Sequence, residues 1–249
     1  MSLYRYVKEE KTIRRKVVNY FSYVTLTLGA LLLFWAFYPV ISFEVYSRFF
    51  FQQKLNSPVP NQIASSITLA NSVLGTSTEL FSNNLRDFTQ ASLWFPTKTK
   101  VSSQRKLDIK EYALSIPKLN IQNAKVIVGG ENLTKGLIQY LPTTLPGEYG
   151  NAVVFGHSTL PQLYNTKDYK TIFTYLPSLE KGDKVMVRIK DVDYEYEVYE
   201  MFVVKPDQIS VLEQRYDGPY LTLITCVPPG TYWNRLVVRA KLTKLPAQL

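Results

Sequence analysis

Residues 220–230 read YLTLITCVPPG, and this stretch contains the end of a strand. The run up to Thr225 has the pattern of a β-strand, whereas the Pro-Pro-Gly sequence at 228–230 cannot continue a hydrogen-bonded ladder. The next strand-like run starts near Arg235. Two consecutive strands joined by so short a loop pair most simply as an antiparallel hairpin, which brings Cys226 beside Arg235. The sequence therefore predicts a thiol next to a guanidinium.

The chain after about residue 105 consists of similar short runs separated by turn residues. In residues 184–190, apolar side chains alternate with mostly polar ones, which is the period-two pattern of a half-buried strand. Seven or eight such strands predict a mainly β domain, a closed barrel or a sandwich, with one or two helical turns around residues 169–179. The expected strands are 112–116, 124–128, 151–155, 184–190, 194–204, 220–225 and 235–242.

The N-terminal part of the chain has the pattern of a membrane anchor. Residues 17–43 carry no charged side chain, and about 20 apolar residues in a helix span a bilayer. The alternatives are a cleaved signal peptide and a buried core helix, but a signal sequence has a shorter apolar region and no small-residue cleavage site follows. By the positive-inside rule the N-terminus is cytoplasmic, because basic residues precede the segment: Arg5, Lys8, Lys11, Arg14, Arg15 and Lys16.

This pattern divides the chain into four predicted parts. Residues 1–16 are predicted to form a cytoplasmic basic tail, 17–43 the transmembrane anchor, 44–105 an extracytoplasmic spacer, and 106–249 the β domain that contains Cys226. The spacer is rich in Ser, Thr and Asn, but residues 93–96 read LWFP. We expect this apolar cluster either to be exposed or to dock onto the domain that follows.

Composition excludes several kinds of site and partner. The chain has one cysteine and one histidine, so it has no Cys/His zinc site and no intramolecular disulfide. Between Glu111 and His157 the only carboxylates are Glu131 and Glu148, which is too few for a calcium cluster, and no cofactor is expected. Nearly half of the net charge of +9 lies in the N-terminal tail, and the rest of the chain has no Lys/Arg run, so we expect no nucleic-acid partner.

His157 is the second candidate for chemistry. It follows Gly156 at the end of the expected strand 151–155, where it can point toward Cys226 and serve as a general acid or base for a thiol nucleophile. Arg235 offers directed donors to an oxyanion. Arg239 lies on the same face of that strand and competes for the role. Taken singly, each residue also has a structural explanation, since a lone cysteine is usually a small core hydrophobe.

Four segments of the chain resemble the sortase family. Thr222-Leu223-Ile224-Thr225-Cys226 matches the Thr-Leu-x-Thr-Cys signature of that family, and residues 235–240 resemble the arginine-bearing strand after it. Residues 151–158 resemble the strand that ends in Gly-His, and residues 114–119 resemble the opening strand of the same barrel. The similarity extends over roughly residues 107–244.

The resemblance implies an eight-stranded sortase-type β-barrel in which Cys226 is the nucleophile, His157 the acid/base and Arg235 the oxyanion or substrate clamp. It implies a transpeptidase that cleaves a sorting signal resembling Leu-Pro-x-Thr-Gly between Thr and Gly. The acyl group then passes from the thioacyl-enzyme to an amine on a cell-envelope precursor or a protein. The alternatives are another cysteine acyltransferase or peptidase, and a catalytically inactive, membrane-tethered binding module on the same barrel.

The resemblance also implies a substrate groove and a subclass. Thr225 in the motif and three residues of the loop 205–218 are expected to contact the sorting signal, although the loop residues would also serve to plug the barrel end. Pilus-assembling sortases commonly have a C-terminal membrane segment and an inhibitory lid with Asp-Pro before an aromatic residue. We expect neither here, because the 93–96 cluster lacks the Asp, and a housekeeping enzyme is favoured. The loop residues are Ile209, Val211 and Leu212.

Overall fold

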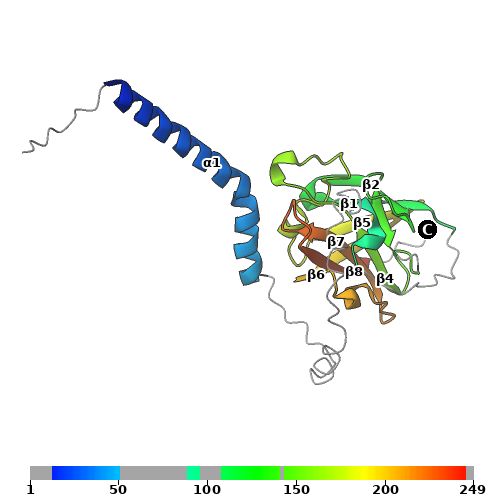
Figure 1. Ribbon diagram of the computed structural model, residues 1–249. Coiled ribbons are helices and arrows are strands. Elements are labelled where there is room, and N and C mark those ends of the chain that lie inside the picture. Colours follow the sequence, from blue (N-terminus) through cyan, green and yellow to red (C-terminus); the bar gives the residue numbers. More distant parts are fainter. Residues whose placement is uncertain (1–12, 51–88, 96–107, 141–142, 245–249) are drawn as a thin grey trace, which may run out of the picture.

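The computed structural model describes residues 13–50, 89–95, 108–140 and 143–244. Within these ranges the fold consists of one long N-terminal helix and one closed β-barrel (Figure 1). Most of the predicted N-terminal tail and of the predicted spacer lies outside the described residues. The four predicted domain boundaries therefore stay predictions.

Helix α1 (Ile13–Phe50) contains the predicted anchor and extends beyond it on both sides. Residues Arg15–Ser47 are long and apolar enough to cross a membrane, and none of the most apolar window is buried against the rest of the protein. The helix is bent (Figure 1), and Pro39 within it accounts for the bend because proline removes one helical hydrogen bond. Its properties fit a membrane anchor.

The barrel is closed by eight strands in the order β1-β2-β3-β4-β7-β8-β6-β5. The pairs β2/β3 and β4/β7 are parallel, and the other neighbouring pairs are antiparallel. The strands are β1 (Glu111–Ile116), β2 (Ile121–Val128), β3 (Leu137–Tyr140), β4 (Gly150–Phe155), β5 (Lys184–Ile189), β6 (Val192–Val204), β7 (Pro219–Val227) and β8 (Asn234–Lys244). The predicted eight-stranded barrel is confirmed.

The seven strands expected from the sequence are all present, with their ends shifted by a few residues. The short strand β3 was not expected, because its four residues LIQY show no alternation of apolar and polar side chains. The helical turns expected around 169–179 reduce to hydrogen-bonded turns and a single 3-10 helix at Leu176–Ser178. Other 3-10 helices are Ala91–Leu93, Pro117–Leu119, Pro161–Leu163 and Ile209–Leu212.

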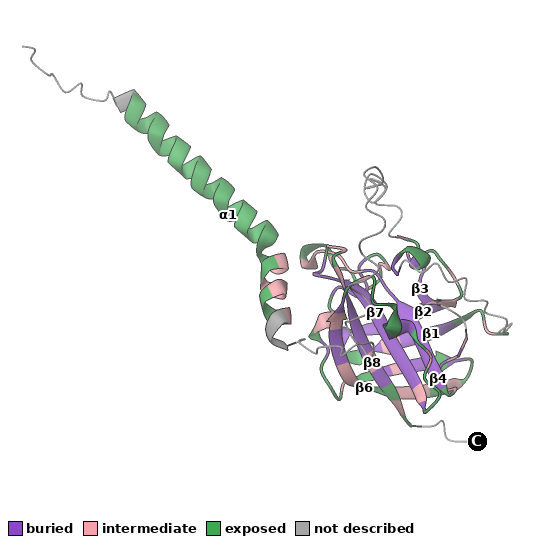
Figure 2. Ribbon diagram, turned by 60° about the horizontal axis from the view of Figure 1, so that its bottom comes forward, coloured by how far each residue is buried: buried purple, intermediate pink, exposed green. Residues whose placement is uncertain are grey.

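Alternate side chains of the strands form two separate apolar clusters. Figure 2 shows that most residues of the barrel strands are buried. The larger cluster fills the barrel interior and includes Leu221 and Leu223 of β7. The smaller one includes Ile224 and Cys226 of the same strand, so it lies on the outer face of the barrel wall. Residues of β3, β4, β6 and β8 also belong to this outer cluster, together with buried side chains from segments outside the barrel strands that cover it.

We expect Leu223→Ala to lower the free energy of unfolding by about 2–5 kcal/mol, because the fully buried leucine leaves a cavity in the barrel interior. Denaturant unfolding of the purified full chain in detergent, followed by tryptophan fluorescence, measures the change. The control is Tyr149→Ala, which removes a side chain that is 68% exposed. Equal stability of the two variants would contradict the assignment of Leu223 to the core.

Candidate active site

Cys226 and Arg235 face each other across the β7–β8 hairpin. They are directly opposed in the antiparallel register, as the sequence predicted from the Pro-Pro-Gly that follows. Strand β7 extends one residue beyond Cys226, to Val227. Both side chains are buried on the outer face of the wall, with 1% of Cys226 and 2% of Arg235 exposed.

His157 reaches the same face through the parallel pairing of β4 with β7. The register pairs Phe155 with Ile224, and two further residues along each chain lead to His157 and Cys226. Hydrogen bonds continue this alignment beyond the strand end, from Gly156 N to the Ile224 carbonyl (3.1 Å) and from Ser158 Oγ to the Cys226 carbonyl (2.6 Å). The structure therefore brings His157, Cys226 and Arg235 together at the ends of three adjacent strands.

Gly156 is required at the bend that presents His157. A side-chain Cβ there would overlap the ring of Phe173 and the side chain of Leu137. The Phe173 N–H in turn donates to the His157 carbonyl at 2.9 Å. This close packing of the backbone against Phe173 fixes the direction in which the His157 side chain points.

The predicted groove residues take different positions. Val211 and Leu212 of the 3-10 helix Ile209–Leu212 are buried in the outer cluster that contains Cys226. Ile209 is 43% exposed and does not join that cluster. Thr225 points to the opposite face of β7 from Cys226, where its hydroxyl donates to the Gly156 carbonyl at 2.8 Å. In this conformation Thr225 aligns β4 with β7 from the other side of the wall.

Residues 89–95 cover the site. The sequence analysis gave docking of the 93–96 cluster onto the domain as one alternative, but it did not predict that the cluster would cover the site residues. The segment is held to the β2–β3 connection by hydrogen bonds from Ala91 N to the Glu131 carbonyl (2.9 Å) and from Leu133 N to the Thr89 carbonyl (3.0 Å). Trp94 and Phe95 are at most 1% exposed. The absence of an Asp argued against a lid, but this segment docks through backbone and aromatic contacts that need no carboxylate. The signal in the sequence was two adjacent aromatic residues in a polar spacer.

Trp94 contacts two of the three site residues. Its ring lies 5.7 Å from the His157 ring and 5.3 Å from the Phe155 ring, centroid to centroid, and it stacks on Phe155. The Arg235 guanidinium lies 5.4 Å from the centre of the Trp94 ring, and its Nη2 donates to the Trp94 carbonyl at 3.1 Å. The segment 89–95 therefore fills the space in front of the site.

The remaining donors of Arg235 show how the guanidinium is oriented. Nη1 donates to the carbonyls of Tyr232 (3.0 Å) and Asn234 (3.2 Å), which holds this edge against the β7–β8 loop. The opposite edge, formed by Nε and Nη2, faces the covering segment, and Nε has no partner among the described residues. One directed donor of the guanidinium is thus left unused in this conformation.

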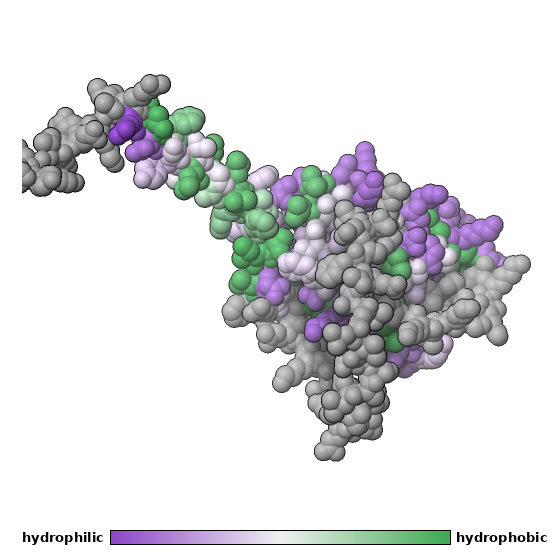
Figure 3. Space-filling model, viewed as in Figure 1, coloured by the Kyte–Doolittle hydropathy of each residue, from purple (hydrophilic) through white to green (hydrophobic). Residues whose placement is uncertain are grey.

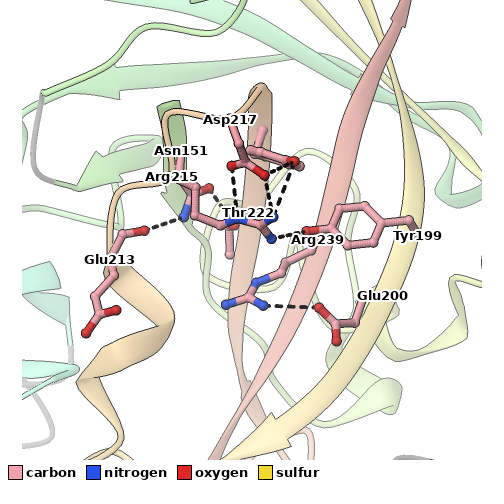
Figure 4. A network of polar contacts seen from close by, with 9 residues as sticks. Asn151, Tyr199, Glu200, Glu213, Arg215, Asp217, Thr222 and Arg239 are labelled. Atoms are coloured by element: carbon pink, nitrogen blue, oxygen red, sulfur yellow. Dashed lines mark hydrogen bonds and ion pairs between the residues drawn. The ribbon is translucent and has the colours of Figure 1, made fainter. Parts of the chain in front are cut away.

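Arg239, the competing arginine, lies four residue pairs farther along the hairpin, opposite Thr222. Its Nη1 binds a Glu200 carboxylate oxygen at 3.1 Å (Figure 4). Its guanidinium lies 5.0 Å from the centre of the Phe202 ring. An ion pair therefore occupies Arg239, whereas Arg235 faces backbone carbonyls. This difference supports the assignment of the site arginine to Arg235.

Burial keeps both titratable groups of the site neutral at pH 7. Desolvation raises the pKa of the Cys226 thiol to about 11, although the nearby Arg235 charge acts in the opposite direction. Desolvation also lowers the pKa of His157 to about 4, and the positive charge of Lys170 adds to this effect. The covered site contains a thiol rather than a thiolate. No group of three His, Cys, Asp or Glu side chains able to hold a metal occurs within the described ranges.

The fold and this cluster define a β-barrel protein with a cysteine-centred site on its outer wall. A family model described as a sortase domain matches residues 114–243, more than half of the chain, so the chain belongs to the sortase family.

Named relatives agree with this assignment. The chain is 27% identical over 133 residues to sortase D of Bacillus subtilis, an alignment that covers 53% of this chain and 61% of the relative. It is 29% identical over 143 residues to sortase A of Bacillus anthracis, with 57% and 61% covered. The alignments therefore span less than two thirds of these relatives. Among solved structures, a sortase D5 transpeptidase of Clostridium perfringens shares 26% identity with a TM-score of 0.47, covering 56% of this chain and 82% of that chain.

We expect Trp94→Ala to increase the alkylation rate of Cys226 by iodoacetamide at least about tenfold at pH 8. Uncovering the thiol lowers its pKa, and each unit of that decrease multiplies the thiolate fraction about tenfold at a pH below the pKa. Mass spectrometry of the single cysteine measures the rate. Leu93→Ala is the matched control, because Leu93 lies in the same segment but is 46% exposed. Equal rates in the two variants would show that the indole does not protect the thiol.

Proposed function

We propose that this sortase-family chain is a membrane-anchored cysteine transpeptidase. The observation that carries the proposal is the hydrogen bond from Arg235 Nη2 to the Trp94 carbonyl, because the guanidinium beside Cys226 already binds a peptide carbonyl. A substrate carbonyl that replaced it would lie next to the thiol. It would also meet Nε, so that two directed donors would face the oxygen as it became an oxyanion.

The reaction divides between the three residues as follows. Neutral His157 accepts the Cys226 proton, and the sulfur forms a bond to the carbonyl carbon of the Thr-Gly peptide bond in a sorting signal resembling Leu-Pro-x-Thr-Gly. The C–N bond then breaks, and the imidazolium protonates the departing amine. An amine of a cell-envelope precursor or a protein attacks the thioester, its proton goes to His157, and the C–S bond breaks. The signal residues that precede the cleaved bond occupy the apolar face formed with Val211 and Leu212.

The segment 89–95 must leave before this reaction begins. In the covered state the Trp94 carbonyl occupies Arg235 and the indole blocks His157, so no peptide can reach Cys226. We propose that the described conformation is the resting state, and that release of the segment exposes the thiol and lowers its pKa. In the extracytoplasmic arrangement, with the basic N-terminus in the cytoplasm, the barrel meets its substrates outside the membrane.

The inactive binding module is the second candidate, and the burial of Cys226 favours it. Such a module binds a sorting-signal peptide without cleaving it. Incubation of the folded Trp94→Ala variant with that peptide separates the two functions. Binding of the peptide without cleavage, in a variant whose Cys226 is alkylated, would favour the binding module.

We expect Cys226→Ala to abolish both cleavage and acyl transfer while the barrel stays folded, since the variant lacks the only thiol of the chain. Liquid chromatography of a sorting-signal peptide incubated with the full chain and a glycine-based amine measures both activities. Circular dichroism checks the fold. Turnover by the folded variant would refute the role of Cys226.

Arg235→Lys tests the geometry of the oxyanion contact, because lysine keeps the charge but not the two parallel donors. We expect kcat/KM to fall by a factor of about 10²–10³, the usual effect of losing one well-placed oxyanion donor. Arg239→Lys is the matched control and should change kcat/KM little, since lysine can retain the ion pair with Glu200. A large fall in kcat/KM for Arg239→Lys with little change for Arg235→Lys would assign the oxyanion contact to Arg239 instead of Arg235.

A further inference from the structure

A groove of about 860 Å³ lies between the second half of α1 and the barrel. Its helix wall includes Trp35, Tyr38 and Phe43, and its barrel wall includes Pro161, Tyr175 and Pro177 of the β4–β5 segment. The lining is predominantly apolar and aromatic. Figure 3 shows that the apolar surface of α1 continues up to the place where the helix meets the barrel.

The helix positions place this groove at the outer surface of a bilayer. If about 20 residues after Arg15 cross the hydrocarbon region, Trp35 and Tyr38 lie at its outer edge, where aromatic side chains are typically found. Side chains just before them, such as Leu31 and Leu33, are more than 60% exposed and would be surrounded by lipid. Trp35 is 63% exposed, so the groove opens on that side toward the hydrocarbon.

We propose that this groove binds the hydrocarbon chain of a membrane lipid. Lipid is the material that surrounds the adjoining part of α1, and burying its chain against aromatic walls removes apolar surface from water. The groove volume of about 860 Å³ falls within the range of pockets that hold small ligands. Ser42 and Tyr46 lie farther from the hydrocarbon on the same wall and suit a lipid headgroup.

The barrel wall of the groove is directly connected to the segment that carries His157. Thr174, a lining residue, accepts a hydrogen bond from Thr159 N at 3.0 Å, and the adjacent Phe173 N donates to the His157 carbonyl. Pro229, three residues after Cys226, also lines the groove. A bound lipid therefore holds the His157 side of the barrel at the membrane surface.

Photo-crosslinking tests this proposal without depending on catalysis. The full chain is placed in vesicles of phosphatidylcholine and phosphatidylglycerol that contain a phospholipid with a diazirine in its acyl chain. After irradiation, mass spectrometry locates the labelled peptides. We expect label on α1 and also on the barrel peptide with residues 161–180, the part of the barrel that lines the groove.

Two groove variants and one control make the result specific. Tyr175→Glu should reduce barrel labelling at least about tenfold, because a carboxylate among apolar side chains costs more than the free energy of a tenfold change in occupancy. Gln162→Trp should also reduce it by filling the groove, and its exposed position makes the change easy to accommodate. Tyr149→Glu, which changes an exposed tyrosine away from the groove, should leave it unchanged. Labelling of α1 should be the same in all variants.

Three results would overturn the proposal. Label confined to α1 would show that no lipid chain enters the groove. Barrel labelling that persisted in both groove variants would show that the lipid chain contacts the barrel outside the groove. Equal barrel labelling in vesicles without phosphatidylglycerol would support recognition of the hydrocarbon chain, whereas labelling that required the anionic lipid would assign the recognition to the headgroup and refute it.

Discussion

The parallel pairing of β4 with β7 determines where every part of the site lies. One register brings Phe155 opposite Ile224, and the hydrogen bonds of Gly156, Ser158 and Thr225 extend this alignment past the end of β4. A shift of one residue would move His157 to the other face of the wall from Cys226. The β7–β8 hairpin then adds Arg235 by its own register. Two strand pairings, rather than any single strong contact, thus assemble the three side chains.

Burial dominates the electrostatics of the covered site. A guanidinium beside a thiol is expected to favour the thiolate, yet the pKa of Cys226 is raised because desolvation outweighs the neighbouring charge. The effect on His157 has the same origin and the opposite sign, since burial disfavours the imidazolium. The protonation states of both residues therefore depend on whether the segment 89–95 is in place.

Local sequence predicted the parts of the fold that local rules control. The Pro-Pro-Gly after Cys226 and the run starting at Arg235 were sufficient to predict the β7–β8 hairpin and its register. Strand β3 pairs in parallel with β2 and has no alternating pattern, so only the closed barrel makes it a strand. Trp94 lies 141 residues from Arg235 in the chain, and the hydrogen bond between them is to a backbone carbonyl, so the two aromatic residues in the spacer do not indicate by themselves which residue they contact. The exposure of Ile209 likewise depends on how its 3-10 helix is oriented.

The covering segment and the site belong to one covalent chain, and this has a consequence for binding. A tethered ligand competes at an effective concentration set by its linkers, which is commonly in the millimolar range for short flexible connections. The backbone hydrogen bonds and ring contacts of residues 89–95 can then close the site even if the same peptide, cut free, would bind weakly. An incoming peptide has to compete with that local concentration. Occupancy of the site by substrate would therefore depend on the length of the linkers that tether residues 89–95, as well as on the contacts that these residues make with the site.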